Sequence, residues 1–269
     1  MSAPAGPRYA ANLSILFPDL PLAERPGAAA GLGFGYAESW WPFDGPAASE
    51  AELAAFCASF ERSGVRLVLL NLTAGASNAT GRGILTDPDA EADLEANLDS
   101  VGAILDRTGC RLVNALYGNR LDPAREAEED ALALDRIVRT ADRLGEHGAT
   151  VVIETLNSVS SPASPLVDID RTAAVVADAR ARSRLGNVAL LLDVYHLTTM
   201  ERDPAEAIRR HGPLIGHVQF ADAPGRGRPG TGGIDFDGVL GALREIGFAG
   251  FVGLEYDPRF RAPAGAAGP

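Results

Sequence analysis

Lysine is absent from this sequence, so all 24 basic residues are arginines, and they face 36 aspartates and glutamates for a formal net charge of −12. This balance argues against a nucleic-acid or anionic-membrane partner, since either would need a basic face. It leaves room for a small anionic substrate, because a local metal ion or arginine can reverse the sign of the charge inside a cleft. We therefore expect a small-molecule partner.

Cysteine is also scarce, and the sequence has no long apolar run. Cys57 and Cys110 stand in no metal-binding or redox spacing, and we interpret them as buried thiols in a reducing compartment. The first residues contain no apolar stretch of the kind found in secretory signals, and nowhere do about 18 apolar residues follow one another. These observations predict a cytoplasmic protein. They do not reveal its oligomeric state, and a homo-oligomer is compatible with them.

Short apolar runs that end in an oxygen-bearing side chain are the main positive signal. Residues 150–153 run into Glu154, residues 189–192 into Asp193, residues 214–218 into Gln219, and residues 251–254 into Glu255. Each pattern is typical of a buried parallel strand. If the strands are neighbours, the four side chains converge, and three carboxylates would then need a cation or shared protons.

Four further strands are predicted at residues 9–15, 34–39, 65–72 and 111–117, with helices between them. Eight alternating strand and helix units without a break in composition predict a single (β/α)8 barrel over residues 9–258. A doubly wound sheet is the alternative, but Leu16, Phe17 and Pro18 after the first strand are not its glycine fingerprint. We expect a flexible N-terminus at residues 1–8 and a disordered tail at 259–269.

The strand ends of such a barrel carry its functional groups. Besides the four residues above, Glu38, Asn71 and Asn114 end predicted strands, and we take Glu38 and Asn71 as candidate substrate-binding residues. An acid after a strand is often only a cap for the next helix. An all-oxygen set of Glu154, Asp193, Gln219 and Glu255 instead suits Mg²⁺ or Mn²⁺, and no organic cofactor is expected.

Two histidines lie close to these strand ends. A histidine there is often only a satisfied core residue; His196 could instead contact substrate, and His217 could support Gln219 from the layer below. The chemistry that such a site supports is proton movement beside a carbonyl. A divalent ion stabilises the enediolate, while two carboxylates remove and return the proton.

At these residues the chain resembles the hydroxypyruvate isomerase family, within the xylose-isomerase-like TIM barrel superfamily. The matching pieces run from about residue 9 to 258. They include Arg82-Gly83, Glu154 with Asn157, Asp193 with Tyr195-His196, His217 with Gln219, Pro229-Gly230-Thr231-Gly232, and Glu255-Tyr256. The resemblance implies interconversion of hydroxypyruvate and 2-hydroxy-3-oxopropanoate (tartronate semialdehyde). It implies that Glu154 and Glu255 are the proton donor and acceptor, and that Glu154, Asp193, Gln219 and Glu255 hold a divalent ion. Arg226 is our candidate for binding the substrate carboxylate, by its bidentate geometry.

The sequence departs from the family pattern in loops that face the pocket. Arg228 and Gly233 flank the Pro-Gly-Thr-Gly motif where the family has acids, and Leu70 stands where a histidine often occurs. The substrate could therefore be a longer 2-oxo acid such as 2-oxotetronate, or a ketose handled by a 3-epimerase. A non-catalytic sugar-acid binding protein is a further alternative. An endonuclease-like phosphodiesterase would need a histidine-rich zinc cluster, whereas this chain has four histidines.

Overall fold

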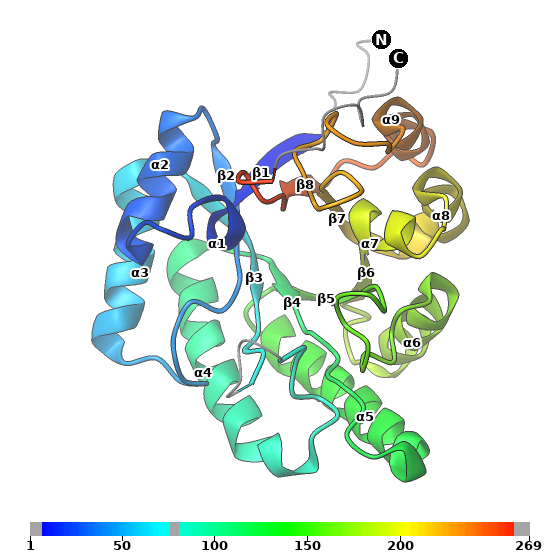
Figure 1. Cartoon of the computed structure of the whole chain (residues 1–269). Helices are drawn as coiled ribbons and strands as arrows, with labels where there is room; N and C mark the ends of the chain where they lie inside the picture. Colours follow the sequence, from blue (N-terminus) through cyan, green and yellow to red (C-terminus); the bar gives the residue numbers. More distant parts are fainter. Residues whose placement is uncertain (1–6, 76–80, 261–269) are drawn as a thin grey trace.

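Eight parallel strands form one closed barrel in the computed structural model, which describes residues 7–75 and 81–260 (Figure 1). The predicted (β/α)8 architecture is confirmed, because each strand pairs with the next along the chain and β8 pairs with β1. The strands are β1 (Arg8–Asn12), β2 (Tyr36–Ser39), β3 (Arg66–Asn71), β4 (Leu112–Asn114), β5 (Thr150–Glu154), β6 (Val188–Asp193), β7 (Ile215–Phe220) and β8 (Phe251–Leu254).

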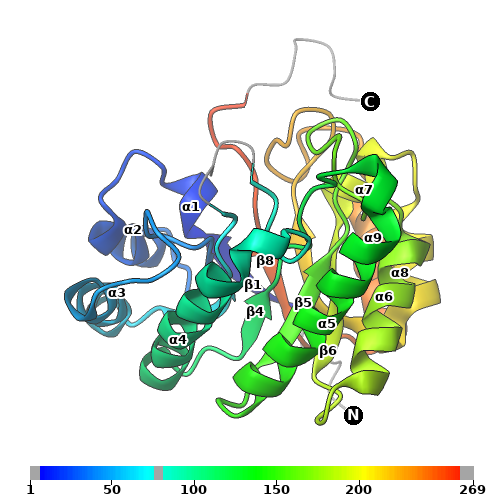
Figure 2. The ribbon, with the colours of Figure 1, turned by 90° about the horizontal axis from the view of Figure 1, so that it is seen from below.

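Helices surround the barrel, and the longer ones run alongside its strands (Figure 2). They are α1 (Leu13–Leu16), α2 (Arg25–Gly31), α3 (Glu50–Ser63), α4 (Glu91–Thr108), α5 (Glu126–Gly145), α6 (Ile169–Arg182), α7 (Val194–Thr199), α8 (Pro204–His211) and α9 (Phe236–Glu245). Short 3₁₀ turns occur at Leu22–Glu24, Pro88–Ala90, Pro123–Arg125 and Gly212–Leu214. Among the residues described, no helix combines the length and the apolar character needed to cross a membrane.

Several boundaries differ from the predicted ones for local reasons. The first strand ends at Asn12 rather than residue 15, because the Asn12 side chain accepts the backbone N–H groups of Ser14 and Ile15 and starts α1. The capping box of α3 is present, with Ser49 and Glu52 bonded to each other's backbone. Sequence reasoning missed α7, which begins directly after β6. The predicted flexible segments at 1–8 and 259–269 lie mostly outside the described residues.

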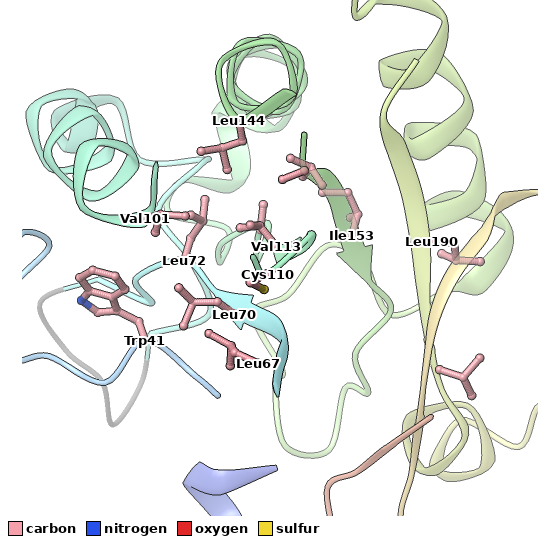
Figure 3. Close-up of a cluster of buried hydrophobic side chains, with 14 of the residues drawn as sticks. Trp41, Leu67, Leu70, Leu72, Val101, Cys110, Val113, Leu144, Ile153 and Leu190 are labelled. Atoms are coloured by element: carbon pink, nitrogen blue, oxygen red, sulfur yellow. The ribbon is translucent and has the colours of Figure 1, made fainter. Parts of the chain in front are cut away.

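The core has two layers, and the strand period of two decides which side chains enter each. Inside the barrel, Leu69, Val152, Ala189 and Leu191 form a small apolar cluster with Leu112 against it. Alternate residues point outward, and the larger cluster packs them against the helices. Figure 3 shows Leu70 and Val113 near Val101 and Leu144, with Leu190 on a strand further along the barrel. The interior cluster therefore lies directly beneath the strand-end side chains inside the barrel.

Candidate active site

Strand parity brings the predicted site residues to one place. Glu154 shares the inward face of Val152, Asp193 that of Leu191, and Asn71 that of Leu69, each two residues further along its strand. Gln219 lies beside Asp193 in the register of β6 and β7, and Gly253 beside Gln219 in that of β7 and β8. All these strands run in the same direction, so the polar side chains meet at the carboxyl-end mouth of the barrel.

Glu38 forms a buried network beneath this mouth. Its side chain accepts hydrogen bonds from Asn12 (2.9 Å), His217 Nε2 (2.7 Å) and Gln219 Nε2 (2.8 Å). Glu38 is 0% exposed and does not line the cavity. The substrate-binding role expected for Glu38 stays a prediction. In the structure Glu38 fixes the amide of Gln219, and His217 lies in the supporting position.

Gly253 makes room for that network. A Cβ on Gly253 would overlap the carboxyl group of Glu38. The position therefore requires glycine for space rather than for backbone freedom, and β8 can approach the buried carboxyl group closely.

Glu154, Asp193 and His196 form a cluster of possible metal-ligating side chains at the mouth. Their ligand-type atoms all lie within 4.8 Å of one another, and all three side chains are buried. Asn114 donates to Oε2 of Glu154 at 2.9 Å. Asp193 combines both interpretations considered for it: Oδ1 caps α7 through the N–H groups of Tyr195 and His196, while Oδ2 lies 3.7 Å from Nε2 of His196.

Hydrogen bonding fixes the tautomer of His196. Oδ1 of Asn157 accepts the backbone N–H of Ser160 at 2.8 Å, so the Asn157 Nδ2 must be the group that donates to His196 Nδ1 at 2.6 Å. Burial, helped by the charges of Arg226 and Arg82, lowers the pKa of His196 well below its usual value. A neutral ring that accepts at Nδ1 carries its hydrogen at Nε2. His196 therefore presents an N–H donor toward Glu154, which suits a substrate oxygen better than a metal ion.

Arg226 lies against two of the acids. Its Nη2 is 3.1 Å from Oε2 of Glu255 and 3.4 Å from Oδ2 of Asp193, and its Nε donates to the Glu255 carbonyl at 3.0 Å. Trp40 donates through Nε1 to the other carboxylate oxygen of Glu255 at 2.6 Å. The Tyr195 ring lies 5.4 Å from the guanidinium carbon of Arg226. Glu255 is therefore held from two sides, and Arg226 is the counter-charge of the site.

The acids of the mouth have raised pKa values. Burial and then the charge of Asp193 raise the pKa of Glu154 to about 7, although the Asn114 hydrogen bond opposes the shift. Burial raises the pKa of Asp193 to about 6 against the opposing charge of Arg226. Burial also raises the pKa of Glu255 well above its usual value, again against Arg226. Burial alone would lower the pKa of Arg226, but the charges of Glu255, Asp193 and Glu154 together raise it.

Asp222 holds the loop that carries Arg226. This buried carboxyl group accepts four backbone N–H groups, those of Ala223, Gly230, Gly232 and Ile234, at 2.8–3.1 Å. The loop is tight enough that a Cβ on Gly232 would overlap the Ala223 carbonyl oxygen, and Arg226 itself has a positive φ of 57°. The Pro-Gly-Thr-Gly motif thus supplies backbone donors to Asp222.

A cavity of about 320 Å³ opens above the acids, and Glu154, Glu255, His196, Arg226 and Asn71 all line it. Its volume lies near the lower end of ligand pockets, which suits a substrate of few atoms. The residues also fit a divalent cation. Oε1 of Gln219 is buried without a hydrogen-bond partner among the described residues, because its amide nitrogen is engaged by Glu38. An unpaired amide oxygen beside buried carboxylates is a hard-oxygen donor set.

Sequence reasoning located the strand-end residues and assigned no role to their partners in loops. Trp40, Asn157 and Asp222 each position a site residue, and Arg82 lines the cavity. The predicted metal and catalytic roles of Glu154, Asp193, Gln219 and Glu255 stay predictions. The structure clusters Glu154 and Asp193 with His196, while it connects Glu255 to Asp193 through Arg226.

The chain belongs to the xylose isomerase-like TIM barrel family, whose model matches residues 26–267. A Streptomyces coelicolor protein named "Putative hydroxypyruvate isomerase" is 43% identical over 94% of this chain and 92% of its own length. A 2-oxo-tetronate isomerase of Haemophilus influenzae is 30% identical over 94% of both chains. These relatives confirm the predicted resemblance to hydroxypyruvate isomerases and the expectation of an isomerase.

Solved structures of the same fold cover nearly the whole chain. A Brucella melitensis protein whose structure is described as an AP endonuclease of family 2 has a TM-score of 0.84 and 30% identity, with 97% of each chain covered. A D-psicose 3-epimerase has a TM-score of 0.75 at 22% identity, over 97% of this chain and 88% of its own. The epimerase likeness supports the barrel fold alone.

Proposed function

We propose that this protein interconverts hydroxypyruvate and 2-hydroxy-3-oxopropanoate by moving a proton between adjacent carbons. The observation that carries the proposal is the pair Glu154 and Glu255, two buried carboxyl groups with raised pKa values that line one small cavity. A carboxyl group with a pKa near neutrality can both accept and return a proton, which general acid–base catalysis requires. The names of the two relatives support the same chemistry.

The reaction needs one proton removed from C3 of hydroxypyruvate and one delivered to C2. Glu154 or Glu255 takes the C3 proton, and an enediolate spans C2 and C3. The hydroxyl proton passes from the oxygen on C3 to the oxygen on C2, and the other glutamate protonates C2, which leaves an aldehyde at C3 and a hydroxyl at C2. His196 donates its Nε2 hydrogen to a substrate oxygen, and Asn71, whose Oδ1 is unpartnered among the described residues, accepts from a hydroxyl.

A divalent cation such as Mg²⁺ or Mn²⁺, held by Glu154, Asp193, Gln219 and Glu255, would polarise the substrate carbonyl and neutralise charge on its oxygen. Gln219 offers Oε1 to it because Glu38 fixes its amide nitrogen. Arg226 neutralises part of the charge of Glu255 and Asp193 and orients both. A cytoplasmic location and a homo-oligomeric assembly also stay predictions.

Substrate panels and chelation test this proposal. Purified protein is assayed on hydroxypyruvate, on 2-oxotetronate and on a set of neutral ketoses, with Mg²⁺ or Mn²⁺ and again with chelator. We expect turnover of hydroxypyruvate that falls on chelation. Faster turnover of 2-oxotetronate than of hydroxypyruvate would instead assign this protein the substrate named for the Haemophilus relative. Binding of hydroxypyruvate without product, even with metal supplied, would contradict the proposal and favour a binding protein.

A further inference from the structure

Arg82 is a second arginine on the cavity wall, and it is bonded differently from Arg226. Its Nε donates to Ser161 Oγ at 2.8 Å, its Nη1 to the Gly81 carbonyl at 2.9 Å, and its Nη2 to the Ser160 carbonyl at 3.1 Å. All three acceptors are neutral. Within residues 7–75 and 81–260, Arg82 forms no ion pair with an acid, although the chain is rich in acids.

The positive charges of the two cavity arginines therefore differ in whether an acid already pairs with them. Arg226 is paired with Glu255 and Asp193 and is needed there to offset buried carboxylates. Arg82 keeps an uncompensated positive charge at the cavity wall. Guanidinium has five N–H donors, and the three bonds above leave two of them, one on each Nη. A carboxylate has two oxygens to accept two such donors.

The backbone around Arg82 is pinned in place. Its carbonyl accepts the N–H of Gly118 at 2.8 Å, which ties the loop after β3 to the loop after β4. At Gly83, with φ of +104°, a Cβ would overlap the carbonyl oxygen of Leu116, so the two loops touch through backbone. Ser160 and Ser161 then hold the side chain from the loop after β5. Three loops thus fix one guanidinium, which lowers the entropic cost of binding an anion there.

Barrel order places this arginine across the mouth from Arg226. Arg82 follows β3 and Arg226 follows β7, and three strands lie between them on each side of the closed barrel of eight. Both line the same cavity as Glu154 and Glu255. A substrate that spans this cavity can place one end at Arg82 and its carbonyl and hydroxyl end at the two glutamates.

We infer that Arg82, rather than Arg226, binds the substrate carboxylate, and that the site is therefore selective for a short 2-oxo acid over a neutral ketose. The inference rests on the proposed isomerase function for the identity of the reacting end. The carboxylate itself is recognised by charge and by two parallel N–H donors. A lysine at position 82 would keep the positive charge but would lose the paired N–H donors of the guanidinium group.

The test compares R82M with R62M, a matched control at an exposed arginine in the last turn of α3 that does not line the cavity. The two probes are hydroxypyruvate and dihydroxyacetone, a neutral molecule with a hydroxymethyl group in place of the carboxylate. For hydroxypyruvate we expect R82M to raise KM and the calorimetric Kd about 10- to 100-fold, with kcat changed less than about threefold. For dihydroxyacetone, R82M and wild type should agree within about twofold, and R62M should match wild type with both probes.

R82K guards against a folding defect, and it should retain part of the affinity for hydroxypyruvate while thermal unfolding stays close to wild type. Unchanged binding of hydroxypyruvate by R82M, or an equal loss for both probes, would overturn the role of Arg82. If wild-type protein binds hydroxypyruvate through Arg82 but never isomerises it, the isomerase proposal fails and the carboxylate-binding role of Arg82 remains. If wild-type protein turns hydroxypyruvate over and R82M has an unchanged KM, the role of Arg82 fails and the isomerase proposal remains.

Discussion

Single side chains in this site have two tasks, and the hydrogen-bond partners decide which atom performs each. Asp193 caps α7 with one oxygen and faces the acids and Arg226 with the other. Gln219 donates through its nitrogen to Glu38, and its oxygen has no hydrogen-bond partner among the described residues. His196 accepts at Nδ1 from Asn157 and keeps its Nε2 hydrogen for another acceptor. Residue type at a strand end therefore predicts a candidate, while the buried neighbour determines its chemistry.

Glu154 should destabilise the metal-free protein at neutral pH. Its folded pKa of about 7 lies above the ordinary value of 4.5, so the folded state holds the proton more tightly. The stabilisation from this proton is complete below about pH 4.5 and is lost as the pH rises through about 7. In chelator, E154Q should therefore unfold with a free energy about 1–3 kcal/mol higher than wild type at pH 8 and nearly equal at pH 4.5. Urea denaturation at the two pH values measures this.

The same substitution should lower kcat by at least about 100-fold, because the proton acceptor is lost. E206Q, at an exposed glutamate on α8, is the control and should change neither property. Equal stability of E154Q and wild type at both pH values would show that Glu154 is not a strained buried acid.

At the scale of elements, the loops after the strands hold the site in shape. The Asp222 cluster fixes the loop after β7, and Arg226 on that loop fixes Glu255 after β8. Close backbone approaches at Gly232 and Gly253 leave no space for a side chain at either position. The barrel strands aim the site side chains toward the mouth, and the contacts of these loops fix the distances between those side chains.

D222N should loosen the loop that carries Arg226. An asparagine oxygen cannot accept all four N–H groups, so two of them lose their acceptor, at a cost of about 1–3 kcal/mol of local stability. We expect faster hydrogen exchange at Gly230 and Gly232 and a kcat about 10- to 100-fold lower. D237N, at an exposed aspartate of α9, serves as the control. Unchanged exchange in D222N would contradict the account of the loop.

G253A should push Glu38 out of its network, since the added methyl group occupies the space of the carboxyl group. Overpacking of this kind costs about 1–3 kcal/mol of unfolding free energy. G35A is the matched control, because a Cβ there meets no atom within 4 Å. Urea midpoints for the two variants decide the question, and equal midpoints would mean that the network tolerates displacement.

The whole molecule shows how far sequence reasoning reaches. Short continuous apolar runs with an oxygen-bearing side chain at the end predicted the parallel barrel and the rim where Glu154, Asp193 and Glu255 meet, because such a run and its last residue are local in sequence. The burial of Glu38 and the contact of Trp40 with Glu255 depend on residues distant in sequence. No local pattern carries that information, so these features required the structure.

Metal binding should stabilise the fold as a whole. A cation that binds only the folded state raises the unfolding free energy by about 2.7 kcal/mol at 100 times its dissociation constant. We expect Mg²⁺ or Mn²⁺ to raise the Tm of chelator-treated wild type, and D193N to reduce that rise while E206Q keeps it. A Tm that does not respond to either ion at millimolar concentration would count against the proposed ligand set.

Proton transfer between adjacent carbons at Glu154 and Glu255 is the central claim, and proton NMR of hydroxypyruvate in heavy water tests it most directly. With wild-type protein and Mg²⁺ or Mn²⁺ we expect deuterium to enter the hydroxymethyl carbon as 2-hydroxy-3-oxopropanoate forms, and E154Q should suppress the exchange. A hydroxymethyl signal that stays fully protonated, with no aldehyde product, would contradict the account.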